Sequence, residues 1–325
     1  MSEKNSEARV IGLNELERLS SDDRIQYFNN LRGLCKERQV NKKTNSMIVK
    51  AIGKTVSKLR PYDLEIEGTE NITTDNNVIF LCNHSNAHDM FTVFEVFYKL
   101  GKPVTPLAAW DGLNCLSRFF FRKGDTILLK RNDAESIASS MLDFCSCVLK
   151  GKSGFIFGEA TWNMHPTKPM QNLHAGVTEI ALITGKRIVP MIFEYVEVDH
   201  MCKKEANIYK KCIVSFGKPV TVKADESIFG QTDKLQETMS SMREELWERE
   251  GIKKSGFTED DIKRYINHTY LKKYKAFGFK YNTNWESQFL LTNGQNIENE
   301  YCLDEEGKFV PGICIDNVTI QKNIS

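Results

Sequence analysis

The chain has 325 residues, of which 41% are hydrophobic and 27% charged, and this ordinary usage excludes a disordered, collagen-like or disulfide-dense chain. The 44 Lys and Arg residues nearly balance the 43 Asp and Glu residues, so no overall charge favours nucleic acid or an anionic bilayer. The N-terminus lacks an apolar segment after its charges and no window approaches the roughly 18 to 20 apolar residues of a membrane span, so we expect a cytoplasmic protein.

The N-terminal part of the chain is predicted to be helical from residue 8 to residue 60. In its last part, residues 47–60, apolar residues recur at helical spacing while lysines line another face. We expect this basic amphipathic helix to pack on the core, and the alternative is that it rests on an anionic membrane surface. Residues 1–61 are assigned to an N-terminal helical segment.

Short apolar runs alternate with helical patterns through the middle of the chain. The runs expected to form strands lie at 63–68, 78–82, 104–108, 126–129, 153–157, 187–193 and 212–217. The helical patterns between them lie at 89–100, 134–150 and 175–185. This alternation predicts an α/β fold with a mostly parallel central sheet flanked by helices. We assign residues 62–225 to this core.

The alternation of strand and helix patterns stops after the core, and a different pattern follows to the end of the chain. Helices are predicted at 232–250 and 258–276. Short strands are predicted around turn residues, at 289–291, 301–303, 309–310 and 313–315. Residues 226–325 are therefore assigned to a C-terminal α+β extension.

The most informative local feature runs from Asn83 to Asp89, between an apolar strand and an apolar helix. In one continuous helix His84 and Asp89 would lie about 140° apart, but across a strand-to-helix turn their side chains can meet. Open α/β sheets place their sites at the carboxyl ends of strands. A carboxylate on one ring nitrogen fixes the tautomer of a histidine and leaves the other nitrogen to take a proton from a hydroxyl. We predict that His84 is a general base and that Asp89 orients it.

Two alternatives compete with this interpretation. His84 can be a turn residue with a structural role and Asp89 an acidic residue that favours a helix N-terminus. A metal site is the other alternative, because His88 follows His84 by four residues and adjoins Asp89, but the glutamate of the His-Glu-x-x-His motif is missing. Cys145 and Cys147 lack a second pair of ligands at zinc-site spacing. We therefore expect no metal.

Short blocks in chain order resemble the glycerolipid acyltransferase family. The family's first block, Asn-His-x-x-x-x-Asp, is matched by Asn83, His84 and Asp89. The second block, an apolar strand that runs into an arginine, is similar to the strand ending at Arg131, with Lys130 where an aspartate is common.

The third block of the family is Phe-Pro-Glu-Gly-Thr-Arg, and the corresponding run here is Phe-Gly-Glu-Ala-Thr-Trp. Glu159 and Thr161 match the family, whereas Gly158, Ala160 and Trp162 replace proline, glycine and arginine. An indole has one donor and no charge, so Trp162 cannot grip a phosphate as a guanidinium does. It can stack on a sugar or another flat apolar face, or simply pack in the wall of the site. Neutral hydrogen bonds are expected from its neighbours Asn163, His165 and His174.

The resemblance extends over residues 62–220 and includes a fourth block at Val189-Pro190. It implies catalysis by His84 and Asp89 and a set of substrate-binding residues: Asn83, Lys130, Arg131, Glu159, Ala160, Thr161 and Trp162. It also implies transfer of a fatty acyl group from an acyl thioester to a hydroxyl without an acyl-enzyme, which agrees with the absence of a Gly-x-Ser-x-Gly run.

The substrates that the resemblance implies are acyl-CoA or acyl-ACP as co-substrate and, as acceptor, a lysophospholipid, glycerol phosphate or related lipid or glycosyl hydroxyl. It implies no bound cofactor, a role in phospholipid biosynthesis, and a cytoplasmic location that can include the inner membrane face. No nucleic-acid partner is expected. The altered third block leaves open a catalytically silent relative that binds lipid or serves as a scaffold.

Overall fold

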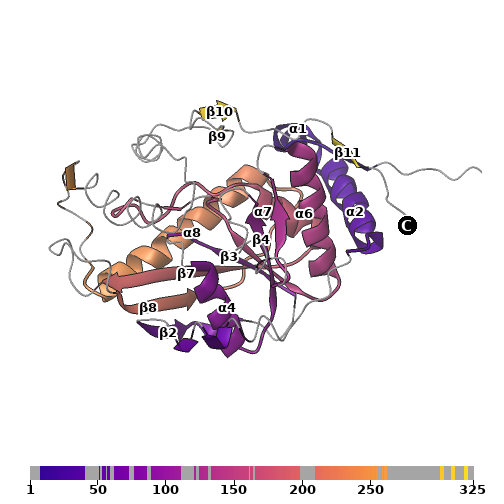
Figure 1. The fold of residues 1–325 in the computed structure, drawn as a ribbon. Helices are drawn as coiled ribbons and strands as arrows, with labels where there is room; N and C mark the ends of the chain where they lie inside the picture. The colour runs from indigo at the N-terminus through magenta and orange to yellow at the C-terminus, as the bar shows by residue number, and fades with distance from the viewer. Residues whose placement is uncertain are drawn as a thin grey trace, which may run out of the picture.

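Figure 1 shows the fold in a computed structural model of the chain. The structure describes most of the chain between residues 8 and 252 and a few short stretches beyond. The described residues are 8–40, 51, 53–55, 57–58, 62–72, 77–85, 89–110, 121, 124–130, 133–160, 162–163, 165–197, 209–252, 254, 256, 258, 260–261, 301–303, 309–311 and 318–320.

A seven-stranded sheet forms the centre of the molecule, in the order β2-β8-β7-β3-β6-β4-β5. Its strands are β2 (Asp63–Glu67), β3 (Ile79–Cys82), β4 (Val104–Ala109), β5 (Ile127–Leu129), β6 (Ser153–Phe157), β7 (Ile188–Glu197) and β8 (Tyr209–Phe216). All neighbouring strands are parallel except β7 and β8, which are antiparallel. The predicted α/β class with a mostly parallel sheet is confirmed.

Helices cover both faces of the sheet. They are α1 (Leu13–Arg18), α2 (Ser21–Glu37), α4 (Asp89–Lys99), α6 (Ala134–Leu149), α7 (Gly176–Thr184) and α8 (Ile228–Arg249), with a short 3₁₀ helix η1 at Thr69–Asn71. Three of them begin at a side chain that accepts from a backbone N–H of the first turn: Ser20 before α2, Asp133 before α6 and Ser227 before α8. Such caps satisfy donors that the first helical turn leaves without a partner.

The strand β3 shows how the sheet divides the core, because all four of its residues are buried. Ile79 and Leu81 point to a core shared with α2, α6, α7 and α8, whereas Phe80 and Cys82 point to a core shared with α4. Successive side chains of a strand face opposite sides. A central parallel strand buried on both faces reads as a continuous apolar run, as β3 does.

The N-terminal prediction is wrong at its start. Ala8–Val10 form the strand β1 rather than a helix, because they pair antiparallel with β11 (Val318–Ile320). The helix α2 ends at Glu37, and it packs against α6 and α7. Within the expected basic helix at 47–60, the residues that the structure describes, 51, 53–55 and 57–58, are helical.

The C-terminal elements predicted at 232–250, 301–303 and 309–310 are present in the structure, whereas the strand β11 was not predicted. The helix α8 occupies the expected position and packs against α7 and β7. β9 (Tyr301–Leu303) and β10 (Phe309–Pro311) form an antiparallel pair. The strands expected at 289–291 and 313–315, and nearly all of the helix expected at 258–276, lie outside the described residues. Within the described part, no helix combines the length and apolar character that crossing a bilayer requires.

Candidate active site

His84 lies in the turn that joins the carboxyl end of β3 to the first turn of α4, where Asp89 begins the helix. His84 Nδ1 is 2.9 Å from Asp89 Oδ2, and the Ser85 N–H donates to the same oxygen at 2.8 Å. Since an ionised carboxylate only accepts hydrogen bonds, this arrangement assigns the proton to Nδ1 and makes Nε2 the basic nitrogen. The strand-to-helix turn brings the predicted pair together, as expected from the sequence.

The Asp89 side chain is fully buried, while 17% of the His84 side chain is exposed. A carboxylate out of contact with water keeps its hydrogen bonds in a fixed direction and interacts more strongly with a cation beside it. The Nδ1 edge of the imidazole therefore faces a preorganised anion, and its ring reaches the surface.

Asn83 ties this turn to the neighbouring strand. Its Nδ2 donates to Phe193 O at 3.0 Å and to Ser85 Oγ at 3.1 Å, and Phe193 N–H donates to Asn83 Oδ1 at 2.7 Å. The side-chain amide thus continues the ladder between β3 and β7 beyond Cys82. The sequence predicted that Asn83 binds substrate, but in the structure its side chain is buried and bonds to the protein's own groups.

Two aromatic rings contact the His84 imidazole. Phe157, the last residue of β6, stacks on it with ring centroids 3.9 Å apart and an angle of 11° between the planes. Trp162 meets it edge to face, with centroids 5.8 Å apart and an angle of 72°. An aromatic face beneath an imidazole supports its positive form through the ring quadrupole. Trp162 therefore forms part of the wall around the base.

Glu159 holds the His84 backbone from the neighbouring strand end. The His84 N–H donates to Glu159 Oε1 and the Gln171 N–H donates to Oε2, both at 2.7 Å. We call these two bonds the Glu159 clamp. The Asn163 N–H donates to His84 O at 2.6 Å, so the segment after β6 binds both backbone groups of the histidine. Because β3 and β6 are adjacent and parallel, their carboxyl ends meet at this point.

Burial raises the pKa of Glu159 to about 7, since only 1% of the residue is exposed. The two backbone donors of the clamp and the positive charge of Arg243 act in the opposite direction, while the charge of Asp89 raises the pKa further. The carboxyl was predicted to contact the acceptor, but both of its oxygens bond to backbone groups of the protein. Its ionisation is therefore balanced close to neutral pH.

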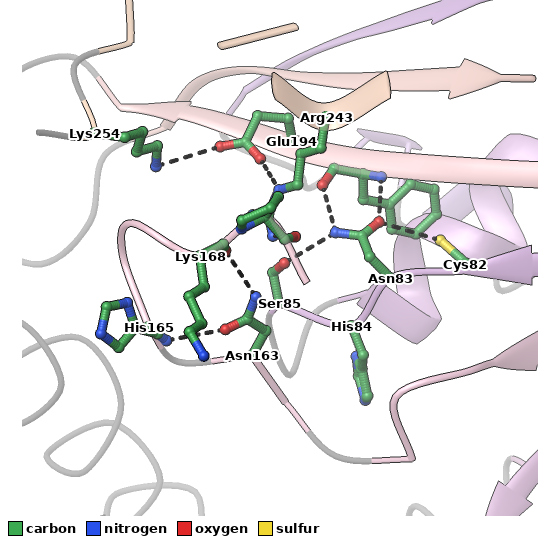
Figure 2. A network of polar contacts seen from close by, with 12 residues as sticks. Cys82, Asn83, His84, Ser85, Asn163, His165, Lys168, Glu194, Arg243 and Lys254 are labelled. Carbon is green, nitrogen blue, oxygen red and sulfur yellow. Dashed lines mark hydrogen bonds and ion pairs between the residues drawn. The ribbon is translucent and has the colours of Figure 1, made fainter. Parts of the chain in front are cut away.

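Asn163 organises the segment 163–171 beside the histidine (Figure 2). Its Nδ2 donates to Lys168 O at 3.0 Å, and its Oδ1 accepts from the His165 N–H at 3.1 Å and from Gln171 Nε2 at 3.3 Å. Burial and the nearby Lys168 lower the pKa of His165 to about 4. His165 is consequently neutral at physiological pH.

Of the departures from the family's third block, the glycine at position 158 has a physical cause in the structure. A Cβ at Gly158 would lie 2.5 Å from Leu81 Cδ1 and 2.7 Å from Leu173 Cδ2, so no proline ring fits there. The Gly158 N–H also donates to Cys82 O at 3.1 Å, a bond that proline cannot make. Ala160 has a φ of 51°, the left-handed conformation that favours the family's glycine. The turn thus keeps its shape although its glycine is replaced.

Ala160→Gly is expected to stabilise the protein. A left-handed conformation costs an L-residue roughly 1 to 2 kcal/mol, part of which is offset by the greater freedom of glycine in the unfolded chain. The expected rise in Tm is about 2 to 4 °C, measured by thermal denaturation. The control is Ala138→Gly in α6, where glycine is expected to lower Tm. An unchanged or lower Tm in Ala160→Gly would contradict the strain argument.

Several predicted residues lie elsewhere or outside the described residues. Lys130 is exposed after β5, the edge strand, two strands away from β6. Arg131, Thr161 and His88 are outside the part of the chain that the structure describes. Sequence patterns assigned no role to three residues at or next to the site: Phe157 beneath the imidazole, Gln171 in the clamp, and Arg243, which donates to Pro169 from α8.

The chain is similar to known proteins in part of its sequence and in its fold. Residues 63–194 match the sequence model of the family described as Acyltransferase. No curated protein matches the chain by sequence. Among solved structures, the chain is similar to the 1-acyl-sn-glycerophosphate (LPA) acyltransferase PlsC from Thermotoga maritima, with 17% identity and a TM-score of 0.47 over 72% of this chain and 95% of that one. The matched segment contains His84, Asp89 and Glu159, and over residues 63–194 the chain is similar to the acyltransferase family.

Proposed function

We propose that the protein transfers a fatty acyl group from an acyl thioester to the hydroxyl of a glycerolipid-type acceptor, with His84 as the general base. The observation that carries the proposal is the bond from His84 Nδ1–H to the buried Asp89, which directs the basic nitrogen away from the protein's own carboxylate. The match of residues 63–194 to the acyltransferase family supports the same reaction class.

The proposed reaction proceeds by direct attack. His84 Nε2 takes the proton of the acceptor hydroxyl while the hydroxyl oxygen attacks the thioester carbonyl. The tetrahedral intermediate collapses with cleavage of the carbon–sulfur bond, and the imidazolium returns its proton to the leaving thiolate. Asp89 and the Phe157 ring stabilise the imidazolium between these steps. The products are an ester and a free thiol, and no acyl-enzyme forms.

The acceptor is proposed to bind over Trp162 and the segment 163–171, beside the basic nitrogen. The half-buried Lys168 supplies a cation there. Burial lowers the pKa of Lys168, which favours an anionic partner for its ammonium group. A phosphate on the acceptor is therefore proposed to contact Lys168, together with the predicted Arg131 and Thr161.

Purified protein should release thiol from acyl-CoA only when an acceptor is present. Lysophosphatidic acid, glycerol 3-phosphate, monoacylglycerol and an alkyl glycoside are suitable acceptors, and acyl-ACP tests the other donor. The amount of ester formed should equal the amount of thiol released. Acyl-chain binding without thiol release from either donor would instead identify a silent lipid-binding relative. Co-sedimentation with anionic and neutral vesicles tests the proposed location at the inner membrane face.

Lys168→Met is expected to raise KM for a phosphate-bearing acceptor about 10-fold, because a charge-assisted hydrogen bond contributes roughly 1.5 kcal/mol. KM for the neutral monoacylglycerol should stay within about twofold of wild type. Initial rates over acceptor concentration give both values. Lys223→Met, which removes an exposed lysine paired with Glu226, is the control. An equal change for both acceptors would refute the phosphate contact.

A further inference from the structure

We infer that Arg243 is a positioning residue that couples α8 to the turn carrying His84. Arg243 lies outside residues 63–194, the segment that matches the acyltransferase family. The inference adds a positioning residue to the proposed function, and the kcat measurements that test it depend on that function. The hydrogen-exchange measurement that also tests it needs no activity and is independent of the proposed function.

The Arg243 guanidinium is buried and makes two directed bonds. Its Nε donates to Glu194 Oε2 at 2.6 Å, and its Nη1 donates to Pro169 O at 2.7 Å. Only 7% of Arg243 and 3% of Glu194 are exposed. The guanidinium also lies over the Trp247 ring, 5.1 Å from its centroid. These contacts fix the group between α8, β7 and the segment 163–171, as Figure 2 shows for the Glu194 pair.

The bond to Pro169 reaches the Glu159 clamp through a short stretch of backbone. Pro169 lies two residues before Gln171, and the Gln171 N–H donates to Glu159 Oε2. The other oxygen of Glu159 accepts the His84 N–H. A displacement of Pro169 would therefore move one of the two clamp donors and, through the carboxylate, the backbone of the base. Misplacement of a catalytic group by about 1 Å can cost about 10²-fold in rate.

Arg243 acts on the clamp by charge as well as by contact. An ionised carboxylate accepts both N–H donors, whereas a protonated carboxyl has an O–H of its own, which conflicts with one of them. The groups that face Glu159 are His84 and Cys82 near β3, Asp89 on α4 and Arg243 on α8. Among these, the guanidinium favours the ionised form and Asp89 opposes it. The positive charge of Arg243 thus helps to keep the clamp formed at neutral pH.

The sign of the pH effect follows from the raised pKa of Glu159. Its carboxyl is protonated in the folded protein below about pH 7, so the clamp weakens as the pH falls through that value. Without Arg243 the pKa rises further, and the weakening starts at higher pH. Arg249, on the same helix, is an exposed arginine paired with Glu67 and Glu250, and it provides a matched control.

Three full-length variants test the inference: Arg243→Met, Arg243→Lys and the control Arg249→Met. In Arg243→Met we expect the acidic limb of the kcat profile to move up by about one pH unit, so that the ratio of kcat at pH 7 to kcat at pH 9 is about 10-fold lower than in wild type, while kcat at pH 9 stays as low as in Arg243→Lys. KM for the acyl thioester should change less than twofold. Arg243→Lys keeps the positive charge, so the acidic limb of its kcat profile should stay near that of wild type. An ammonium group cannot donate to Glu194 and Pro169 in the geometry of the guanidinium, so kcat should still fall.

Hydrogen exchange of the His84 and Gln171 amides, both donors of the clamp, gives the readout that needs no activity. We expect about 10-fold faster exchange of both amides in Arg243→Met than in Arg249→Met. Wild-type exchange in Arg243→Met, or a loss of kcat in that variant that is equal at every pH, would overturn the inference. If Arg243→Met does not fold, exchange of the two amides in Arg243→Lys and Arg249→Lys decides: faster exchange in Arg243→Lys supports the inference, and equal exchange overturns it. If wild type consumes no acyl thioester, the proposed function fails while exchange still decides the coupling.

Discussion

Replacing His84 with alanine is expected to lower kcat about 10²- to 10⁴-fold, because general-base help to the attacking hydroxyl contributes that much to the rate. The acyl thioester should bind as in wild type, since the imidazole acts on the acceptor. The measurements are initial rates of thiol release and calorimetric titration with acyl-CoA. Residual turnover above the uncatalysed rate is expected from positioning of the two substrates alone.

The fold of the His84→Ala variant should be retained. Asp89 keeps the bond from the Ser85 N–H but loses its partner in the imidazole, and a buried acceptor left short of one bond costs roughly 1 to 3 kcal/mol. A fall in Tm of a few degrees with an unchanged circular dichroism spectrum is therefore expected. Wild-type turnover in this variant would exclude His84 as the base.

Asp89→Asn is expected to lower kcat about 10²- to 10³-fold while leaving KM for both substrates within a few-fold. The Asn amide oxygen can still accept from both His84 Nδ1–H and the Ser85 N–H, because both donors meet one oxygen in the native carboxylate. The tautomer is then kept, but the imidazolium loses its negative partner. Asp89→Ala removes orientation as well, so its kcat should be lower than that of Asp89→Asn.

Asp22→Asn is the matched control for the carboxylate. Asp22 also lies in the first turn of a helix, α2, but it is exposed, whereas Asp89 is buried. Any effect of removing a negative charge from a helix N-terminus should appear in both variants. A kcat ratio near one between Asp89→Asn and Asp22→Asn would contradict the assigned role of Asp89.

The sheet could be predicted because its signals are local. Each run predicted as a strand between residues 63 and 217 overlaps a strand of the structure. Burial on both faces imposes a continuous apolar run on central strands such as β3, whereas the edge strand β2 alternates apolar and acidic residues. The meeting of His84 with Asp89 was predictable for the same reason, because both residues lie in one short turn. The opposite case is β1, whose only partner in the described part of the chain, β11, is more than 300 residues away. A strand of three residues is too short to show a pattern of its own, and no pairing strand lies near it in the chain to indicate a hairpin.

The environment of the site could not be predicted from local patterns. Arg243 sits in a run that reads as an ordinary charged helix, yet its partners Glu194 and Pro169 lie 49 and 74 residues away. Glu159 matches a family block, which suggested substrate contact, but its burial follows from the packing of the segment after β6. Patterns of residue type locate a carboxyl in the chain, whereas the fold decides whether water reaches it.

The stacking of His84 on Phe157 also gives the base a spectroscopic label. Protons held over the face of a phenyl ring experience its ring current, and a centroid separation of 3.9 Å with nearly parallel planes places the imidazole well inside that field. The Cδ2 and Cε1 protons of His84 should therefore resonate upfield of those of the other histidines. Proton NMR can then follow the titration of this one imidazole in the unlabelled protein, and binding of a substrate that separates the two rings would move its signals downfield.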